Sequence, residues 1–255
     1  MSDGRWTFQL QAGEHWRAQH ELNRHAQRHA LAIIIARPPS HGGPINTASG
    51  CILNHSNRHY LLTANHVLSA FERQVSEDQS VRWQVSFPTG PDKHLIFDPR
   101  ERNVCRDVTE DVAAIELTGD EVTRMGASVC SVPLGWPPPG LVPGDFIVLA
   151  GYPRMYREQQ GRQISFPALA AVCEVTTTGT YHLVWQWERE RIVNITGPEV
   201  PTPGSDLGGM SGGPVFLLRE LVYPLVGVIT DFSQAWDLLR VSHLRALACL
   251  PSEAA

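Results

Sequence analysis

The sequence lacks the features that mark several classes of protein. Its five cysteines lie far apart and form no C-x-x-C pair, which argues against both a disulfide framework and a zinc site. No stretch approaches the roughly 18 apolar residues of a membrane-spanning helix, and residues 1–10 lack the basic segment and apolar run of a secretory signal. A formal net charge of −5 provides no overall positive field for nucleic acid or an anionic membrane. These absences predict a soluble cytoplasmic protein with reduced thiols.

The composition is that of a folded protein. Of 255 residues, 42% are hydrophobic, which is ample for a core, and 18% are charged, which is low for a disordered chain. Short segments rich in β-branched and aromatic residues recur between polar turns, with little helical pattern between them, and this predicts an all-β barrel architecture. The strands are expected at 31–36, 49–53, 59–63, 82–87, 94–97, 111–117, 144–151, 169–177, 181–187, 191–195, 215–218 and 225–230.

A proline- and glycine-rich stretch at 131–143 has the composition of a linker. It divides the chain into an N-terminal helical extension at 1–29, a first half at 30–130 and a second half at 144–255. An amphipathic segment near 236–250 predicts a C-terminal helix.

The N-terminal extension is predicted to hold a polar amphipathic helix over 13–30. Glu21, His25 and His29 fall on one face of that helix, a spacing that is compatible with metal binding. No further cluster of ligands is evident, so a solvated polar face is favoured and no metal is predicted.

One serine lies in a run that is too rich in glycine for a helix or an ordinary strand, G-G-M-S-G-G-P at 208–214. Glycine permits positive φ and close approach of the backbone, as a loop that directs N–H groups at a substrate oxygen requires. The alternative is a plain Gly-Ser-Pro turn. Two further residues upstream favour a functional role for Ser211.

The first is His66, directly after the predicted strand 59–63, where backbone on both sides can hold its ring; taken alone, it is more often structural. The second is Asp111, which opens an apolar segment. A buried carboxylate is unfavourable unless it is hydrogen-bonded, so Asp111 is expected to have a partner; the alternative is a solvated aspartate at a strand start. Asp107 is the weaker candidate because polar residues surround it.

Together these residues have the composition of a nucleophilic site. A serine hydroxyl needs a base within hydrogen-bond reach, histidine has a suitable pKa, and a carboxylate fixes the tautomer of the imidazole. The sequence offers His66, Asp111 and Ser211 in that order.

Three segments resemble the signature motifs of the chymotrypsin/trypsin-like serine peptidases: T-A-N-H-V at 63–67, D-V-A-A-I-E-L at 111–117 and G-M-S-G-G-P at 209–214. The segment G-D-F-I-V-L-A-G-Y-P at 144–153 is similar to the first strand of the second barrel in bacterial members. The matches extend over residues 30–245.

The resemblance implies two six-stranded antiparallel β-barrels and a serine endopeptidase that acts on polypeptides through an acyl-enzyme, without a cofactor. Ser211 would be the nucleophile, His66 the general base and then acid, and Asp111 the orienting carboxylate. The backbone N–H groups of Gly209 and Ser211 would form the oxyanion hole.

The chain departs from the family pattern at three places. Cys51 matches one partner of a disulfide found beside the catalytic histidine of secreted animal trypsins, but Val67 follows His66, so that bridge cannot form. Met210 replaces the aspartate that captures a newly cleaved N-terminus, so activation by that route is not expected. The N-terminal extension has no counterpart, and we predict that it docks a regulatory protein partner in an intracellular bacterial protease.

By the same resemblance, residues before Ser211 and the strand at 227–232 line the substrate pocket. Ser205 matches the position at the pocket base. Its neighbour Asp206 would favour Arg or Lys if it points inward; the alternative is a solvated loop aspartate. Thr230 and Phe232 come from the strand, and Phe232 would narrow the pocket toward small side chains.

Two other functions stay open. One is a catalytically silent trypsin-like fold used as a protein-binding module. The presence of His66, Asp111 and Ser211 argues against it. The other is a serine esterase, because a fold does not fix a function.

Overall fold

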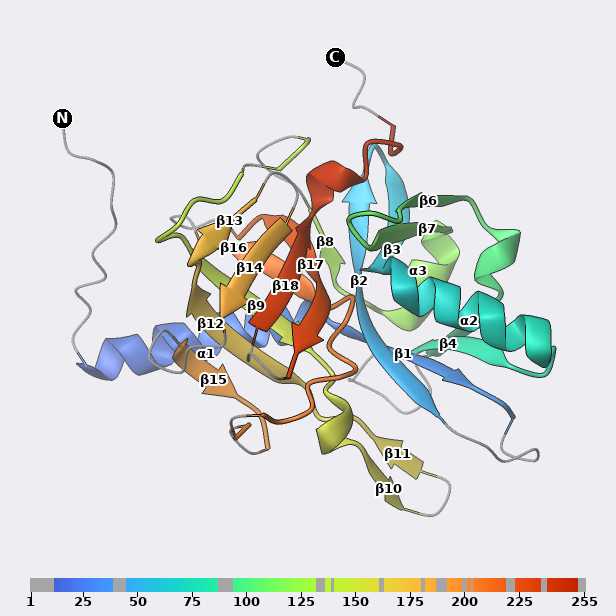
Figure 1. Ribbon diagram of the computed structural model, residues 1–255, viewed down its shortest axis with the longest axis horizontal. Coiled ribbons are helices and arrows are strands. Elements are labelled where there is room, and N and C mark those ends of the chain that lie inside the picture. Colours follow the sequence, from blue (N-terminus) through green and yellow to red (C-terminus); the bar gives the residue numbers. More distant parts are fainter. Residues whose placement is uncertain are drawn as a thin grey trace.

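Two largely antiparallel β-sheets, one from each half of the chain, form the body of the protein (Figure 1). The computed structural model describes residues 12–38, 45–86, 94–131, 136–138, 140–160, 163–179, 182–186, 192–198, 201–202, 204–218, 223–234 and 238–251.

The first sheet has the strand order β5-β4-β1-β2-β3-β7-β6, and β8 pairs in parallel with β2. Its strands are β1 (Leu31–Ala36), β2 (Asn46–His55), β3 (Arg58–Ala64), β4 (Arg82–Ser86), β5 (His94–Phe97), β6 (Val104–Asp107), β7 (Val112–Leu117) and β8 (Val129–Cys130).

The second sheet has the order β13-β14-β18-β17-β16-β9-β12-β15. Its strands are β9 (Phe146–Gly151), β12 (Leu169–Glu174), β13 (Thr177–Thr178), β14 (His182–Gln186), β15 (Ile192–Thr196), β16 (Pro214–Leu217), β17 (Leu225–Ser233) and β18 (Leu238–His243). A separate hairpin, β10 (Glu158–Gln160) and β11 (Gln163–Ser165), projects away from both sheets (Figure 1).

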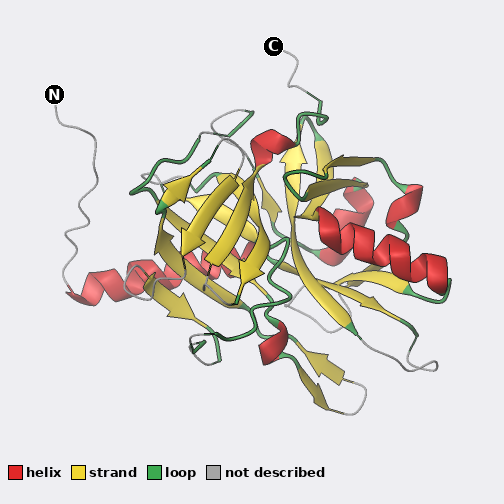
Figure 2. Cartoon of the chain, in the orientation of Figure 1, coloured by secondary structure: helices red, strands yellow, loops and turns green. Residues whose placement is uncertain are grey.

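Helices lie at the margins of the two sheets (Figure 2). They are α1 (Ala12–His29), α2 (Asn65–Glu77), α3 (Gly119–Met125) and the 3₁₀ turns η2 (Pro99–Glu101), η3 (Arg154–Tyr156) and η5 (Leu244–Ala246). None of the described helices is both long and apolar enough to cross a membrane.

Each sheet encloses an apolar core that follows from its strand sequences. In the first sheet, Trp83 is fully buried, and its ring meets that of Phe71 from α2 at 5.5 Å. Leu68, Phe71 and Val75 recur at helical spacing, so α2 buries one apolar stripe against the sheet and leaves its other side to solvent. This packing fixes the start of α2, where His66 lies.

The predicted all-β architecture in two parts is confirmed, and every predicted strand corresponds to an observed one. Each sheet holds eight strands instead of the six expected. Part of the difference comes from the two-residue strands β8 and β13, which are too short to leave a pattern in the sequence.

The predicted C-terminal helix near 236–250 is wrong. The segment forms β18 and the single turn η5. Leu239 and Val241 are fully buried where β18 pairs with both β14 and β17. Pairing on both sides outweighs the local helical pattern, as tertiary context often does.

Helix α1 packs across β9 and β12 of the second sheet (Figure 1). Ala26 and Ala30 are fully buried in the contact. The rings of His25 and His29 lie 4.9 Å and 5.4 Å from the ring of Phe216 in β16. The prediction of a solvated face is therefore wrong for the two histidines and holds only for exposed Glu21. Among the described residues, no group of three His, Cys, Asp or Glu side chains is placed to hold a metal ion.

The packing of His25 predicts a pH dependence of stability. Burial, with smaller contributions from His29 and Arg28, lowers the pKa of His25 from 6.5 to about 4. The unfolded chain binds this proton more tightly than the folded chain. His25 therefore does not reduce the free energy of unfolding above about pH 6.5, and it lowers that free energy progressively as the pH drops toward about 4. We expect His25→Phe, which keeps a ring against Phe216 but cannot titrate, to flatten the dependence of the melting temperature on pH in this window.

His94→Phe is the control for this experiment, because His94 is exposed in β5. Some slope will remain in the His25→Phe variant, since burial also lowers the pKa of His29. Parallel curves for wild type and His25→Phe would contradict the assignment.

A disulfide joins Cys105 of β6 to Cys249, 144 residues further along the chain. The prediction that the cysteines form no disulfide is therefore wrong for this pair, while Cys51, Cys130 and Cys173 are free and buried. Reasoning from spacing detects only pairs that are local in sequence, whereas here the fold brings distant cysteines together. The bond ties the last described segment of the second half to the first half and restricts the unfolded chain.

Candidate active site

His66 and Asp111 form a doubly hydrogen-bonded pair at the start of α2. The His66 backbone N–H donates to Asp111 Oδ1, and His66 Nδ1 lies 2.7 Å from Asp111 Oδ2. The first N–H groups of a helix have no partner within it, and here the Asp111 carboxylate, from the turn before β7, accepts one of them. A hydrogen bond from Nδ1 to a carboxylate requires the proton on Nδ1, which leaves Nε2 as an acceptor.

The turn that carries Asp111 holds this residue in an uncommon conformation. Asp111 has φ of 57°, in the left-handed region that few residues other than glycine adopt. Its carbonyl oxygen accepts the backbone N–H of Asn65 at 3.0 Å. Asp107, the weaker candidate, shapes the same turn by accepting the Glu110 N–H at 2.9 Å. The carboxylate that bonds to His66 is that of Asp111.

Two residues of β18 brace this turn from the second sheet. The Ser242 hydroxyl donates to the Glu110 carbonyl oxygen, and Arg240 lies 3.5 Å from the Glu110 carboxylate in an ion pair. The amphipathic pattern of this segment predicts a helix, so the sequence does not indicate either residue as part of the site. The brace shows that both sheets support the position of Asp111.

Ser211 lies in the turn ahead of β16, against the first sheet. Its carbonyl oxygen accepts the backbone N–H of Ser49 in β2 at 2.8 Å. A Cβ at Gly212 would overlap the Ser49 carbonyl oxygen and the Thr63 Oγ1. Thr63 precedes His66 by three residues, so the turn that carries Ser211 packs on the strand that leads into His66. The structure thus brings the three predicted residues to one junction between the sheets.

Two N–H groups of this turn have no acceptor among the described residues, those of Gly209 and Ser211. The neighbouring donors are all paired: Met210 N with Leu207 O, Gly212 N with Ile229 O and Gly213 N with Met210 O. Gly209 has φ of 101°, a conformation that suits glycine. Two unpaired donors, one on the nucleophile candidate itself and one two residues before it, suit an oxygen that gains negative charge.

Met210 is buried in the apolar core of the second sheet, with 1% of its surface exposed. An apolar side chain in this environment supplies no charge for a new N-terminus, in agreement with the departure from the family noted in the sequence.

The pocket candidates before Ser211 have polar partners within their own loop. The Ser205 hydroxyl lies 3.2 Å from that of Thr202. Asp206 is exposed, and its Oδ1 accepts the Gly208 N–H at 2.7 Å. This bond supports the alternative of a loop aspartate, here one that shapes the turn before Ser211.

The candidates from β17 differ in environment. Thr230 is 1% exposed, and its hydroxyl lies 3.1 Å from that of Ser242. Phe232 is partly buried against the core of the second sheet. Thr230 therefore belongs to the brace behind Asp111 and has little surface to offer a substrate.

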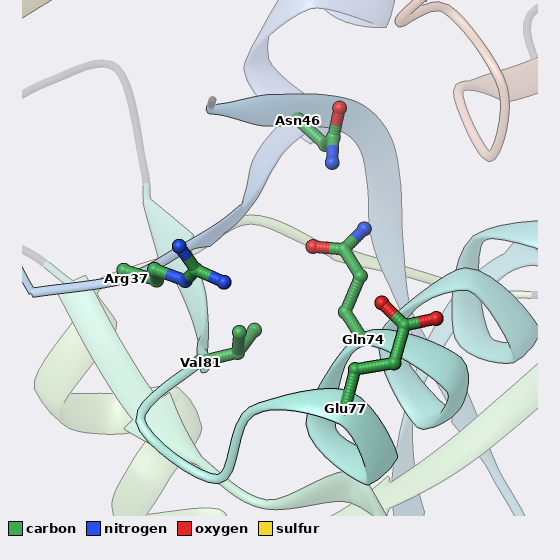
Figure 3. A pocket seen from close by; sticks show the side chains of 5 residues that line it. All are labelled: Arg37, Asn46, Gln74, Glu77 and Val81. Atoms are coloured by element: carbon green, nitrogen blue, oxygen red, sulfur yellow. The ribbon is translucent and has the colours of Figure 1, made fainter. Parts of the chain in front are cut away.

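A separate pocket lies between β1, β2 and α2 in the first sheet (Figure 3). Its lining residues are Arg37, Asn46, Gln74, Glu77 and Val81. Arg37 is exposed and pairs with Asp78 at 2.6 Å. None of the candidate catalytic residues lines this pocket.

A model of the trypsin-like peptidase domain matches residues 48–227, which include His66, Asp111 and Ser211. The chain therefore belongs to the trypsin-like peptidase domain family. It is a trypsin-like serine protease, as the sequence predicted. No curated protein matches the sequence.

Solved structures share the fold at low sequence identity. A Glu endopeptidase in complex with MPD is 14% identical with a TM-score of 0.51, over 86% of this chain and 85% of that chain. A chain from a study of the intrinsically disordered Sesbania mosaic virus VPg protein is 16% identical with a TM-score of 0.50, over 89% and 92%. The protease Anisep from Arthrobacter nicotinovorans is 14% identical with a TM-score of 0.48, over 85% and 90%. The predicted chymotrypsin-like fold class is confirmed.

Proposed function

We propose that the protein is a serine endopeptidase that cleaves peptide bonds through Ser211, His66 and Asp111. The observation that carries the proposal is the 2.7 Å contact between His66 Nδ1 and Asp111 Oδ2, beside the turn that carries Ser211. The contact places the imidazole proton on Nδ1 and leaves the Nε2 lone pair to receive the proton of a serine hydroxyl.

In the proposed reaction, Ser211 Oγ attacks the carbonyl carbon of the scissile bond while His66 Nε2 takes the hydroxyl proton. The oxyanion accepts hydrogen bonds from the N–H groups of Gly209 and Ser211. His66 then donates the proton to the leaving amine, which departs and leaves an acyl-enzyme on Ser211. Water attacks this ester by the same sequence and releases the acid. Asp111 stabilises the imidazolium in each step. No cofactor takes part in these steps.

We also propose that the enzyme is an intracellular bacterial protease regulated by a protein partner at its N-terminal extension. Helix α1 supports a docking role because it is held to the second sheet by its buried face, while Glu21, Arg24 and Arg28 are exposed. The cytoplasmic location remains a prediction. Disulfides such as Cys105–Cys249 are more frequent in oxidising compartments than in the cytoplasm. The redox state of this pair in freshly lysed cells therefore tests the location: reduced thiols favour the cytoplasm, and an intact disulfide favours an oxidising compartment.

Labelling with a fluorophosphonate probe tests the proposed chemistry. We expect the wild-type chain to be labelled at Ser211, and Ser211→Ala and His66→Ala to lose labelling, because the probe reacts only with an activated serine. Ser76→Ala is the matched control, since Ser76 is exposed in α2 and, within the described segments, its hydroxyl bonds only to the Arg73 carbonyl oxygen.

A folded wild-type chain that takes no label would refute an assembled catalytic site and favour a binding module. If the wild type is labelled, hydrolysis of a peptide library separates an endopeptidase from an esterase, which would cleave ester but not amide substrates.

A further inference from the structure

Ser49, in β2 of the first sheet, makes three hydrogen bonds to the second half of the chain. Its hydroxyl donates to the Gly209 carbonyl oxygen at 2.7 Å and accepts the Tyr152 N–H at 2.9 Å. Its backbone N–H donates to the Ser211 carbonyl oxygen at 2.8 Å. Ser49 is fully buried, so water does not compete for these bonds. No motif in the sequence singles out this serine.

The two peptide units that carry the unpaired N–H donors are held at their carbonyl oxygens. The unit that ends at Gly209 has its oxygen, on Gly208, held by the Arg154 N–H at 2.6 Å. The unit that carries the second donor has its oxygen, on Met210, held by the Gly213 N–H at 2.9 Å. Because the C=O and N–H of a trans peptide point in opposite directions, each of these bonds directs an N–H away from the group that holds the carbonyl oxygen of the same peptide unit.

The peptide unit between these two begins with the Gly209 carbonyl, and the Ser49 hydroxyl holds it. Rotation of this middle unit changes the orientation of both donors relative to each other. The hydroxyl can donate only one proton, and acceptance from Tyr152 leaves Gly209 as its acceptor. Tyr152 in turn precedes Arg154 by two residues, so one hydroxyl connects both supports of the loop.

We propose that Ser49 is a positioning residue that holds the oxyanion hole of this enzyme in its reactive geometry through its side-chain hydroxyl. The inference rests on the proposed function, in which the N–H groups of Gly209 and Ser211 bind the oxyanion. It also assigns the first sheet a role in that hole, although both donors belong to the second half. With Met210 in place of a charged residue, the loop is held from β2 and not by an ion pair beside Ser211.

Thr47 provides a matched control on the same strand. It lies two residues before Ser49, is 8% exposed, and its Oγ1 is 3.4 Å from the position of a Cβ on Gly209. Within the described part of the chain, this hydroxyl has no hydrogen-bond partner. Thr47→Val therefore removes a hydroxyl beside the same loop without removing a bond.

The test compares Ser49→Ala, Ser49→Cys and Thr47→Val with wild type on a peptide amide substrate chosen by library profiling. We expect Ser49→Ala to lower kcat by about 10²-fold, the loss that follows removal of one oxyanion donor. KM and the pH dependence of kcat should stay unchanged, since His66 and Asp111 are untouched. Ser49→Cys has a similar volume and a weaker hydrogen-bonding group, so its kcat should lie between those of wild type and Ser49→Ala. Thr47→Val should match wild type.

A peptide aldehyde forms a tetrahedral adduct with the serine. Its affinity provides a second measurement, which would not change if Ser49 had only a structural role. Its affinity should fall by the same factor as kcat in Ser49→Ala, while that of the corresponding peptide alcohol, which has no carbonyl oxygen to place in the oxyanion hole, stays unchanged. The inference is wrong if folded Ser49→Ala keeps its kcat, or if kcat falls while aldehyde affinity stays the same. If Ser49→Ala does not fold, an unchanged kcat and aldehyde affinity in Ser49→Cys overturns it. A wild-type chain that fails to react with fluorophosphonate instead refutes the proposed function itself.

Discussion

Replacing Asp111 with asparagine is expected to lower kcat by about 10⁴-fold, which is the loss known for the same change in a protease with a Ser-His-Asp triad. Asp111 accepts two hydrogen bonds from His66, one from the backbone N–H and one from Nδ1. Asparagine has one acceptor oxygen. If its oxygen faces the backbone N–H, its NH₂ group faces Nδ1, which must then be an acceptor, and the ring proton moves to Nε2. In that tautomer, the histidine cannot take the proton of Ser211.

The measurement is kcat on a peptide amide substrate, with thermal unfolding as a check on the fold. Asp107→Asn is the matched control, because an amide oxygen there still accepts the Glu110 N–H. We expect the control to stay within a few-fold of wild type. Equal losses in the two variants would show that the turn matters and the tautomer does not.

Gly212→Ala is expected to destabilise the fold by about 2–5 kcal/mol, because overpacking costs about 1–3 kcal/mol and a left-handed backbone at an L-residue costs about 1–2 kcal/mol more. A Cβ at Gly212 would overlap the Ser49 carbonyl oxygen and the Thr63 Oγ1, both on the first sheet. These atoms belong to paired strands and cannot move aside at little cost. Gly212 also has φ of 91°, which L-residues rarely adopt.

Gly144→Ala separates these two causes. Gly144 has the same φ of 91° but no heavy atom within 4 Å of its Cβ position. Its loss should therefore be backbone strain alone, about 1–2 kcal/mol. Urea unfolding of both variants in a Ser211→Ala background avoids self-digestion. Equal losses at Gly144 and Gly212 would mean that the close approach of the loop to the first sheet contributes nothing.

The sequence contained enough to predict most of the strands and the three candidate catalytic residues. Each predicted strand is a run rich in apolar residues bounded by turn residues, and Ser211 lies in a glycine-rich string typical of a tight loop. The capping box of α3, formed by Thr118 and Glu121, is a signal of the same local kind. These signals are local, because they depend on residues within a few positions of one another.

The features that were missed depend on contacts between distant segments. Residues 238–243 have an amphipathic pattern, and only the two neighbouring strands make them a strand. Cys105 and Cys249 meet through the docking of the two halves. The role inferred for Ser49 depends on a loop 160 residues away. An isolated serine in a strand gives no signal of such a partner, so only the folded structure identifies it.

The disulfide has a consequence for how a cut chain behaves. Cys105 lies before the proline-rich stretch at 131–143, and Cys249 lies after it. Cleavage within that stretch, by the enzyme itself or by another protease, therefore gives two polypeptides that remain one covalent molecule. On a gel without reductant, such a molecule has the mass of the intact chain. A preparation of this protease can thus consist of two-chain enzyme while it passes for uncut material, until the disulfide is reduced.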